Sequence, residues 1–420
     1  MASRGTAPGT ATPGAARAAD AAHDVTGAPT VPDPPDLVPP GSAPPTGPAR
    51  WVRGAWMVGR RTLRYRMRGR GRPVTYAVNF ATWKWPFMRR LFPDRHLCFV
   101  PVTASARMLR ALERRVPPDD ALVWGMAVPP AFARLAARRK LGVRHVEDGF
   151  IRSVGLGAGH VPPLSLCIDG QGAHFNPRAP SDLETLIRTH DFDADPALMA
   201  RARALMRRIV EEGVTKYNLA GGASRQAARD ASGERPRVLC VGQVEDDQSI
   251  LFGCEGPVSN NDLVRLAARE NPDADVLYKI HPDYLAGHRT PRSSTAEIEG
   301  LCRIVGDEVP LDALLPGMDR LYTFTSLSGF EALMRGVPVT TLGMPFYAGW
   351  GVTDDRAPAP ERRDRERSVA EIFAAAYLLY PTYLDPETGE RTDLEATLDR
   401  ILAARAREGT RGGTGGREAA

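Results

Sequence analysis

From residue 97 onward, short runs of apolar residues alternate with segments in which apolar and polar residues recur at helical spacing. The runs predict strands at Leu97–Val102, Ala121–Trp124 and Val143–Val146, and the periodic segments predict helices at Ala104–Arg115 and Pro130–Lys140. Strands that alternate with helices favour a parallel sheet with crossover helices on its faces. The first half of the chain is therefore predicted to be an α/β domain.

The same alternation returns after a break. Beyond a looser stretch with a short strand at Leu164–Ile168 and a helix at Pro196–Gly213, residues 220–236 are small, polar and glycine-bearing. That composition is typical of an interdomain linker. Strands follow at Val238–Val241 and Asp275–Ile280. A second α/β domain is therefore expected after the linker.

The clearest βαβ unit comes late in the chain. Leu321–Thr325 is a β-branched and aromatic run, Phe330–Arg335 has helical spacing, and Gly336 ends that helix before the strand Val337–Leu342. The loop that follows, at 345–351 (PFYAGWG), is rich in aromatic residues and glycine. Because ligands bind at the carboxyl ends of strands in open α/β sheets, this loop is a candidate ligand contact.

Together these patterns predict an α/β protein with two Rossmann-like domains that face each other over a cleft. We place the N-terminal domain at 51–219 and the C-terminal domain at 237–405. Residues 1–50 and 406–420 are dominated by small residues, proline or arginine. Such segments bury too little apolar surface to offset chain entropy, so both are predicted to be disordered tails.

Composition narrows the class of protein. Apolar content of 43% and charged content of 25% are those of a globular protein, and 420 residues suffice for two cores. The five cysteines have no C-x-x-C spacing, which indicates neither a zinc site nor a disulfide framework and fits a reducing cytoplasm. No run approaches the ~18 apolar residues of a membrane span, and the N-terminus lacks the pattern of a secretory signal. We therefore expect the protein to stay inside the cell.

Basic residues gather near the start of the first domain. Residues 51–72 hold eight arginines among Trp51, Trp56 and Met57, and residues 81–92 (ATWKWPFMRRLF) repeat this character. Such a segment can lie on an anionic membrane surface. It can equally be a solvated arginine face, in a chain where only four of 55 basic residues are lysine. Nucleic-acid binding is not indicated, since no recognisable module accompanies the arginines.

Four polar segments follow predicted strands, and the first lies in the N-terminal domain. Glu147 and Asp148 come directly after the strand Val143–Val146, and Arg152 is close behind. Adjacent acids can act as a general acid or base, and an arginine can grip a carboxylate or phosphate. The alternative is a surface turn, since Asp-Gly is a common turn dipeptide.

The second polar segment follows the strand that ends at Val241. It contains Gln243 and three consecutive acids, Glu245, Asp246 and Asp247. Three acids at a strand end could bind a metal or supply a carboxylate nucleophile. The alternative is a solvated loop in which an aspartate caps the next helix.

The third segment contains two basic side chains two residues apart. Lys279 and His281 are expected on the same face of the strand Asp275–Ile280, and two cations at one point favour an anionic ligand. A lone histidine is nevertheless more often structural.

The fourth segment lies where a strand passes into a helix. Ser326, Ser328 and Gly329 offer backbone N–H groups at a helix start, where the dipole favours an anion. Glu331, in the first turn, is placed to accept hydrogen bonds from a ribose. The alternative is that a serine merely caps the helix, which is its commoner use.

The order of these motifs resembles a known family. The strings VEDGFIRSVGLG, GQVEDD, KIHPD, TSLSGFEALMRG and PFYAGWGVTDD, with NFATWKWPFMRRLF and the KYN at Lys216–Asn218, are similar to those of the bacterial capsule-polysaccharide synthesis family. The resemblance extends from Val78 to Pro381. Members of this family are Kdo transferases that build a β-Kdo linker on a lysophospholipid. The resemblance implies a GT-B fold, CMP-β-Kdo as donor and retention of the β configuration.

The resemblance also implies roles for individual residues. Retaining enzymes of this kind pass through a covalent sugar–aspartate adduct, which points to Asp247 as the nucleophile, with Asp246 next. Glu147 would be the acid/base, and His281 with Lys279 would hold the CMP phosphate. The other donor-binding residues of this prediction are Ser326, Ser328, Gly329, Glu331 at the ribose, Gln243 and Arg152. Because CMP carries one phosphate, no metal need bridge a diphosphate, and no cofactor is expected.

A lysophospholipid or Kdo-terminated acceptor implies a peripheral position on the cytoplasmic face of the inner membrane and leaves open an association with capsule export machinery. Larger family members carry two transferase modules in tandem and this chain has one, so whether it adds one Kdo or alternates linkages is open. Two other functions remain: a GT-B nucleotide-sugar epimerase, and a non-catalytic subunit of a capsule export complex. A Gly-rich dinucleotide fingerprint is absent, which argues against an NAD enzyme.

Overall fold

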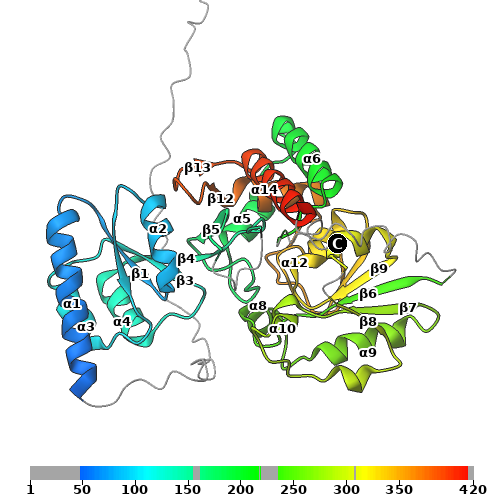
Figure 1. Cartoon of the computed structure of the whole chain (residues 1–420), viewed down its shortest axis with the longest axis horizontal. Helices are drawn as coiled ribbons and strands as arrows, with labels where there is room; N and C mark the ends of the chain where they lie inside the picture. Colours follow the sequence, from blue (N-terminus) through cyan, green and yellow to red (C-terminus); the bar gives the residue numbers. More distant parts are fainter. Residues whose placement is uncertain (1–47, 155–160, 217, 219–234, 307–308, 415–420) are drawn as a thin grey trace, which may run out of the picture. The chain divides into compact units, whose positions relative to one another are not determined.

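The computed structural model describes residues 48–154, 161–216, 218, 235–306 and 309–414 (Figure 1). The predicted linker at 220–236 falls almost wholly outside these ranges, as do most of the predicted N-terminal tail and residues 415–420. The prediction of a disordered C-terminal tail from residue 406 is wrong for its first part, because the last helix continues to Thr414.

The first of two sheets has seven strands in the order β13-β12-β5-β4-β3-β1-β2. Strands β1 to β4 are parallel, and β5, β12 and β13 join them through antiparallel pairs. The bounds are β1 Val74–Val78, β2 His96–Val100, β3 Asp120–Trp124, β4 Gly142–Asp148, β5 Ser165–Asp169, β12 Pro381–Leu384 and β13 Arg391–Thr392. Strands β2 to β5 confirm the predicted strands within two residues.

Strand β1 has no counterpart in the sequence prediction, although it lies between β2 and β3. All five of its residues are buried. A central strand covered on both faces lacks the apolar–polar alternation that marks a half-buried strand.

Strands β12 and β13 lie within the range predicted for the C-terminal domain, 237–405, yet they pair into the first sheet through β5. The buried hydroxyl of Tyr380 supports this crossing by donating to Asp169 at the end of β5, 2.8 Å away. Such a return of the chain depends on partners about 200 residues away in sequence, and no local pattern reveals it. The other domain boundaries remain predictions.

Helices α1 to α4 lie beside the parallel part of this sheet, and α1 packs against α3 and β2 (Figure 1). Helices α5 and α6 pack instead against the helical segment at residues 369–379. Capping fixes several starts: Ser105 accepts from the Met108 N–H at α3, and Asp195 accepts from the Leu198 N–H at α6. The bounds are α1 Pro48–Arg68, η1 Thr82–Lys84, α2 Trp85–Leu91, α3 Ala106–Glu113, α4 Pro130–Arg139, α5 Asp182–Thr189 and α6 Pro196–Glu211. No helix in the described ranges is both long and apolar enough to cross a bilayer.

The second sheet has six parallel strands in the order β11-β10-β9-β6-β7-β8. Its strands are β6 Arg237–Val241, β7 Asp275–Lys279, β8 Arg303–Val305, β9 Arg320–Thr323, β10 Val339–Thr341 and β11 Asp354–Asp355. The chain winds outward from β6 to β8 and then returns to β9 on the other side of β6. A ligand site is expected at the carboxyl ends of β6 and β9, where the strand order reverses.

The helices of this half are α8 Gln248–Gly253, α9 Asn260–Glu270, α10 Pro282–Leu285, η3 Thr295–Ile298, α11 Leu311–Leu314, η4 Leu315–Gly317, α12 Leu327–Leu333, α13 Val369–Phe373, η5 Ala374–Leu379 and α14 Leu394–Thr414. Helix α9 packs on β6, β7 and β9. Both sheets consist largely of parallel strands and have helices packed beside them, which confirms the predicted α/β class.

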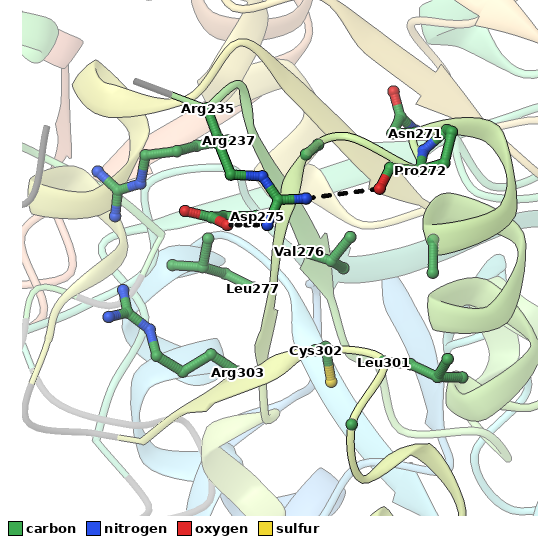
Figure 2. A pocket seen from close by; sticks show the side chains of 13 residues that line it. Arg235, Arg237, Asn271, Pro272, Asp275, Val276, Leu277, Leu301, Cys302 and Arg303 are labelled. Atoms are coloured by element: carbon green, nitrogen blue, oxygen red, sulfur yellow. Dashed lines mark hydrogen bonds and ion pairs between the residues drawn. The ribbon is translucent and has the colours of Figure 1, made fainter. Parts of the chain in front are cut away.

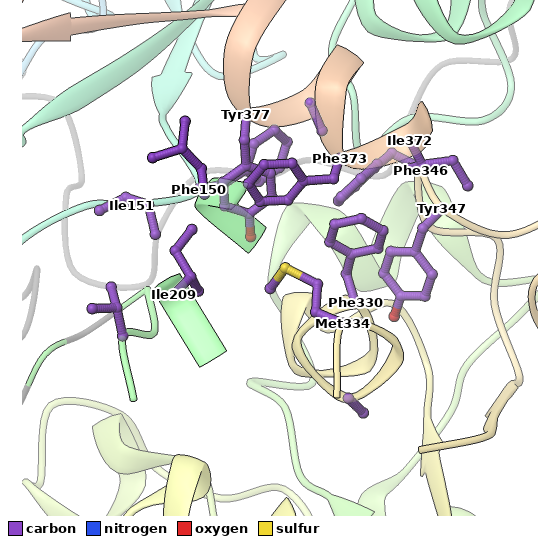
Figure 3. Close-up of a cluster of buried hydrophobic side chains, with 14 of the residues drawn as sticks. Phe150, Ile151, Ile209, Phe330, Met334, Phe346, Tyr347, Ile372, Phe373 and Tyr377 are labelled. Atoms are coloured by element: carbon purple, nitrogen blue, oxygen red, sulfur yellow. The ribbon is translucent and has the colours of Figure 1, made fainter. Parts of the chain in front are cut away.

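The aromatic loop predicted to contact a ligand is instead part of the core. Phe346, Tyr347 and Trp350 are buried, and Phe346 packs on Phe150 and Phe330 with ring centres 4.7 Å and 5.4 Å apart (Figure 3). Trp350 donates its indole N–H to the Phe346 carbonyl at 2.9 Å. The loop therefore joins the two halves through apolar packing, which argues against a direct ligand role.

Candidate active site

Two polar segments from different sheets meet beside Gly125, which follows β3. The Met126 N–H donates to Oε1 of Gln248, the first residue of α8, over 3.0 Å. A Cβ built on Gly125 would lie 3.1 Å from that oxygen and 3.3 Å from Oε1 of Glu147 at the end of β4. Gly125 also has a positive φ of 69°. Glycine is therefore favoured here, because a side chain would be strained by the positive φ and crowded by both segments.

Glu147 has the most informative protonation behaviour at this meeting point. Burial, with help from Asp148 and Asp247, raises its pKa to about 7, while Lys84 and Lys216 oppose the shift. A carboxyl with this pKa is present in both forms near neutral pH, which is what a general acid/base requires. The predicted acid/base role therefore fits the surroundings of this side chain.

Asp148, next in sequence, is held in the opposite state. Burial disfavours its charge, but Lys84 and Arg152 outweigh burial and lower its pKa. Its Oδ2 accepts from Nε of Arg152 at 2.8 Å, whereas Oδ1 is buried without a hydrogen-bond partner. Neighbouring carboxyls whose pKa values are moved apart are a common feature of catalytic sites.

Arg152 was predicted to contact the donor, and the structure gives it another position. Its side chain is fully buried, and it donates to Asp148 and, over 2.8 Å, to Oγ of Ser153. These contacts direct the guanidinium toward the protein interior. Arg152 therefore orients Asp148 and is not placed to grip a ligand directly.

Two lysines that the sequence prediction did not assign to the site lie beside these acids. Lys84 is buried with its ammonium 2.8 Å from the centre of the Trp124 ring. Burial lowers its pKa to about 8, against the opposing effect of Asp148 and Glu147. A signal was present in the sequence, since the chain has only four lysines and this one lies between two tryptophans.

Lys216 is the second such lysine, and its backbone is fixed from two directions. Its N–H donates to Oε1 of Glu331 at 2.9 Å, and its carbonyl accepts from the Arg152 N–H at 3.2 Å. The positive charge of Lys216 opposes the rise in the pKa of Glu147 and contributes to lowering the pKa of His281. The ammonium therefore lies near groups from both sheets.

Glu331 was predicted to bind a ribose, and it lies in the interior instead. The side chain is buried, and burial raises its pKa, with Arg335 and the hydrogen bond from Lys216 opposing. One of its oxygens holds the Lys216 backbone. Glu331 is thus a positioning residue for Lys216.

Of the three consecutive acids, only Asp247 lies in this cluster. It is exposed and caps α8, with Oδ1 accepting from the N–H and Oγ of Ser249 at 2.9 Å and 2.7 Å. Its negative charge contributes to raising the pKa of Glu147 and opposes the lowering at His281. Capping, the structural alternative, is therefore confirmed, and it holds the carboxylate close to the other candidates.

The other two acids have different partners. Asp246 forms ion pairs with Arg292 at 3.4 Å and Arg289 at 3.7 Å. Glu245 is buried and accepts from the backbone N–H groups of Asn260 and Arg292 at 2.7 Å and 3.2 Å. Within the described ranges, no three His, Cys, Asp or Glu side chains are grouped so as to hold a metal ion.

His281 follows β7 and caps α10. Its Nδ1 accepts from the Asp283 N–H at 3.1 Å, which places the proton of the neutral ring on Nε2. Burial lowers its pKa, although Asp283 and Asp247 oppose the shift. The ring is therefore a neutral N–H donor at physiological pH and suits an anionic oxygen.

The sequence predicted Lys279 and His281 on the same face of one strand, and the structure separates them. Strand β7 ends at Lys279, so the alternation that placed both cations on one face does not extend to His281. The buried ammonium donates to the carbonyls of Gly306 and Val309 at 2.9 Å and 2.8 Å. Lys279 therefore anchors the loop after β8.

The other predicted donor-binding residues also have structural contacts. Ser326 caps α12 by accepting from the Ser328 N–H at 3.1 Å, and a side chain at Gly329 would collide with the Tyr347 hydroxyl. Gln243 is buried, and its amide oxygen accepts from the Thr325 N–H at 2.8 Å, which ties β6 to β9. The sequence placed these residues at the correct strand ends, but their main contacts are within the protein.

Known proteins resemble this chain in sequence. Residues 119–385 match the family described as "Capsule polysaccharide biosynthesis protein". The chain belongs to this family. It is 42% identical over 330 residues to the lipopolysaccharide-processing protein LpsZ of Rhizobium meliloti, a match covering 79% of this chain and 74% of that protein. It is 35% identical to the capsule polysaccharide modification protein LipA of Neisseria meningitidis serogroup B, and the match spans 45% of that protein's length.

Two solved structures from the same bacterium are also similar to this member of the capsule polysaccharide biosynthesis family. The β-Kdo 2,4-transferase of KpsC from Thermosulfurimonas dismutans superposes with a TM-score of 0.66 at 31% identity, covering 79% of this chain and 98% of that one. The β-Kdo 2,7-transferase of the same protein has a TM-score of 0.60 at 29% identity. The second match also covers 79% of this chain, and 99% of the other.

A separate pocket of 640 Å³ opens at the amino-terminal ends of β6 and β7 (Figure 2). Arg237, Asp275 and Arg303 line it, and Arg235 pairs with Asp275 at 3.5 Å. None of the predicted site residues lines this pocket. Ligands of parallel sheets bind at the opposite, carboxyl ends of the strands, so we do not assign the pocket to the active site.

Proposed function

We propose that this protein is a glycosyltransferase that moves Kdo from CMP-β-Kdo to a lipid-linked or Kdo-terminated acceptor during capsular polysaccharide synthesis. Family membership and the similarity to two Kdo transferases support this reaction. The observation that carries it is that Glu147, with a pKa raised to about 7, and Gln248, the neighbour of Asp247, both approach Gly125. Asp247 and Lys216 act electrostatically on both Glu147 and His281. A cytoplasmic, peripheral position on the inner membrane, and contact with capsule export machinery, form part of the same proposal.

In the donor complex, CMP lies at the carboxyl ends of β6, β7 and β9, in a GT-B arrangement of the two sheets. His281 donates its Nε2 proton to the single phosphate, and Lys216 adds positive charge. Kdo is itself a sugar acid, so its carboxylate offers a second partner for Lys216 or Lys84. Because these groups neutralise one phosphate and one carboxylate, the reaction needs no bridging metal.

The proposed chemistry proceeds in two displacements. The Asp247 carboxylate attacks the anomeric carbon of Kdo, the bond from that carbon to the phosphate oxygen breaks, and CMP leaves with the bonding electrons. Glu147 then removes the proton from the acceptor hydroxyl, whose oxygen attacks the same carbon and releases the Asp247 carboxylate. Two inversions give net retention.

The test uses the purified full-length chain with CMP-Kdo and either a lysophospholipid or a soluble Kdo-tipped oligosaccharide. Release of CMP together with the extended acceptor is the expected result. If neither acceptor is extended and no CMP is released while the protein remains folded, a non-catalytic role in a capsule assembly complex becomes the better explanation.

A further inference from the structure

Helix α1 has one face that belongs to the core of the first sheet. Met57 and Val58 are buried in the same cluster as Tyr76 and Leu109, and Tyr65 packs against it. The helix contacts α3 and β2, and Figure 1 shows it alongside α3. The orientation of α1 about its own axis is therefore fixed by packing.

The opposite face carries three large apolar side chains in water. Trp56, Leu63 and Met67 are 63%, 59% and 70% exposed. At about 100° per residue, these three positions lie within about 40° of one another around the helix axis and span about 16 Å along it. We refer to Trp56, Leu63 and Met67 as the α1 stripe.

Arginines flank the α1 stripe on both sides. By the same helical geometry, Arg60 and Arg64 lie about 40° and 80° to one side of Trp56, and Arg66 lies about 80° to the other. The Arg60 guanidinium lies 4.5 Å from the centre of the Trp56 ring. Residues 48–93 contain no Asp or Glu, so this segment carries no negative side chain of its own.

The aromatic residues Trp83, Trp85 and Phe87 do not share this exposure. Trp85 stacks on Phe99 with ring centres 4.6 Å apart and donates its indole N–H to the Phe80 carbonyl at 3.0 Å. Phe87 is buried in a hydrophobic cluster with Phe99, and Trp83 packs against that cluster. The apolar side chains of residues 81–92, which the sequence had grouped with the basic segment, thus pack in the core.

We propose that the α1 stripe and its flanking arginines dock the protein on an anionic lipid bilayer, with α1 parallel to the surface. Aligned apolar side chains enter the boundary between headgroups and acyl chains, and the arginines meet lipid phosphates. A nucleic acid would use the arginines but would leave Leu63 and Met67 in water, so a bilayer is the better match. The inference rests on charge and exposure and does not require the proposed transferase activity.

The experiment is flotation of the full-length chain with vesicles of phosphatidylcholine alone or with about 30% phosphatidylglycerol. We expect flotation with anionic vesicles only, weakening as salt rises because charge screening shortens from about 8 Å at physiological ionic strength to about 3 Å at 1 M. Each basic residue near an anionic surface strengthens binding about fivefold, so Arg60→Gln with Arg64→Gln should weaken binding about 25-fold. The matched control is Arg203→Gln with Arg207→Gln, two exposed arginines of α6, which should leave binding unchanged.

Replacing the stripe itself separates a bilayer from a purely electrostatic partner. Trp56→Ser, Leu63→Ser and Met67→Ser together should abolish flotation at physiological salt, whereas Leu301→Ser with Ile304→Ser, exposed apolar residues elsewhere, should not. Circular dichroism checks that each variant is folded. Flotation of the triple variant equal to wild type, absence of wild-type flotation, or capture by duplex DNA in place of vesicles would each overturn the proposal. Failure of the transferase assay would leave the flotation result unaffected.

Discussion

The ends of β4 and β9 looked equivalent in sequence and differ in the structure. Glu147 and Asp148 are the last two residues of β4, and Ser326 and Ser328 follow β9 closely. At β4, Glu147 and Asp148 keep perturbed pKa values beside two lysines, and Asp148 retains an unpartnered oxygen. At β9, Ser326 caps a helix and Glu331 binds a backbone N–H. Polar residues at a strand end indicate a catalytic site only when their hydrogen-bonding capacity is not consumed by the fold.

Glu147→Gln should show the largest effect on the β4 side. Removing a general acid/base costs about 10²–10⁴-fold in kcat, with little change in donor KM. Steady-state kinetics with CMP-Kdo and a soluble Kdo-tipped acceptor measure it. A change of less than tenfold in kcat would contradict the assignment of Glu147.

Glu331→Ala should act mainly on stability, since it leaves the partly buried Lys216 N–H without its acceptor. We expect the free energy of unfolding to fall by about 1–3 kcal/mol. Glu331→Gln keeps an acceptor and is the matched control, with near wild-type stability and donor KM. An increase in donor KM for both variants at unchanged stability would restore the ribose role that the sequence suggested.

Lys84→Met should change the pH dependence of the reaction. Lys84 lowers the pKa of Glu147, so its removal raises that pKa further above the ordinary value of a carboxyl. Since the base form of Glu147 exists above its pKa, the rising acid limb of kcat, near pH 7 in the wild type, should move upward by about one unit. The exposed Lys140, replaced by Met, is the control. If the acid limb of the kcat–pH profile does not move in Lys84→Met, Lys84 does not influence the pKa of Glu147.

Ser326→Ala should show the smallest effect. Loss of a helix cap lowers the free energy of unfolding by about 0.5–2 kcal/mol, and donor KM should change less than threefold. Ser328→Ala, which removes no cap, should change neither quantity. A tenfold increase in donor KM for Ser326→Ala at unchanged stability would instead support a phosphate contact.

The sequence located most strands and the strand ends that form the site, because apolar runs and the residues after them are local features. It missed β1, which is buried on both faces, and the pairing of β12 with β5, which joins distant parts of the chain. The side-chain contacts were harder still. Which lysine approaches Glu147 depends on the carbonyls and carboxylates that surround each lysine in three dimensions. Lys279, for example, donates to the loop carbonyls of Gly306 and Val309.

The central claim is that Asp247 forms a covalent bond to the sugar, and intact-mass analysis after incubation with CMP-Kdo tests it most directly. We expect the wild type and Asp246→Asn to gain the mass of one Kdo residue, which peptide mapping places on Asp247. Asp247→Asn should gain nothing and should not extend an acceptor. An adduct on Asp247→Asn, or transfer by that variant at the wild-type rate, would contradict the assignment.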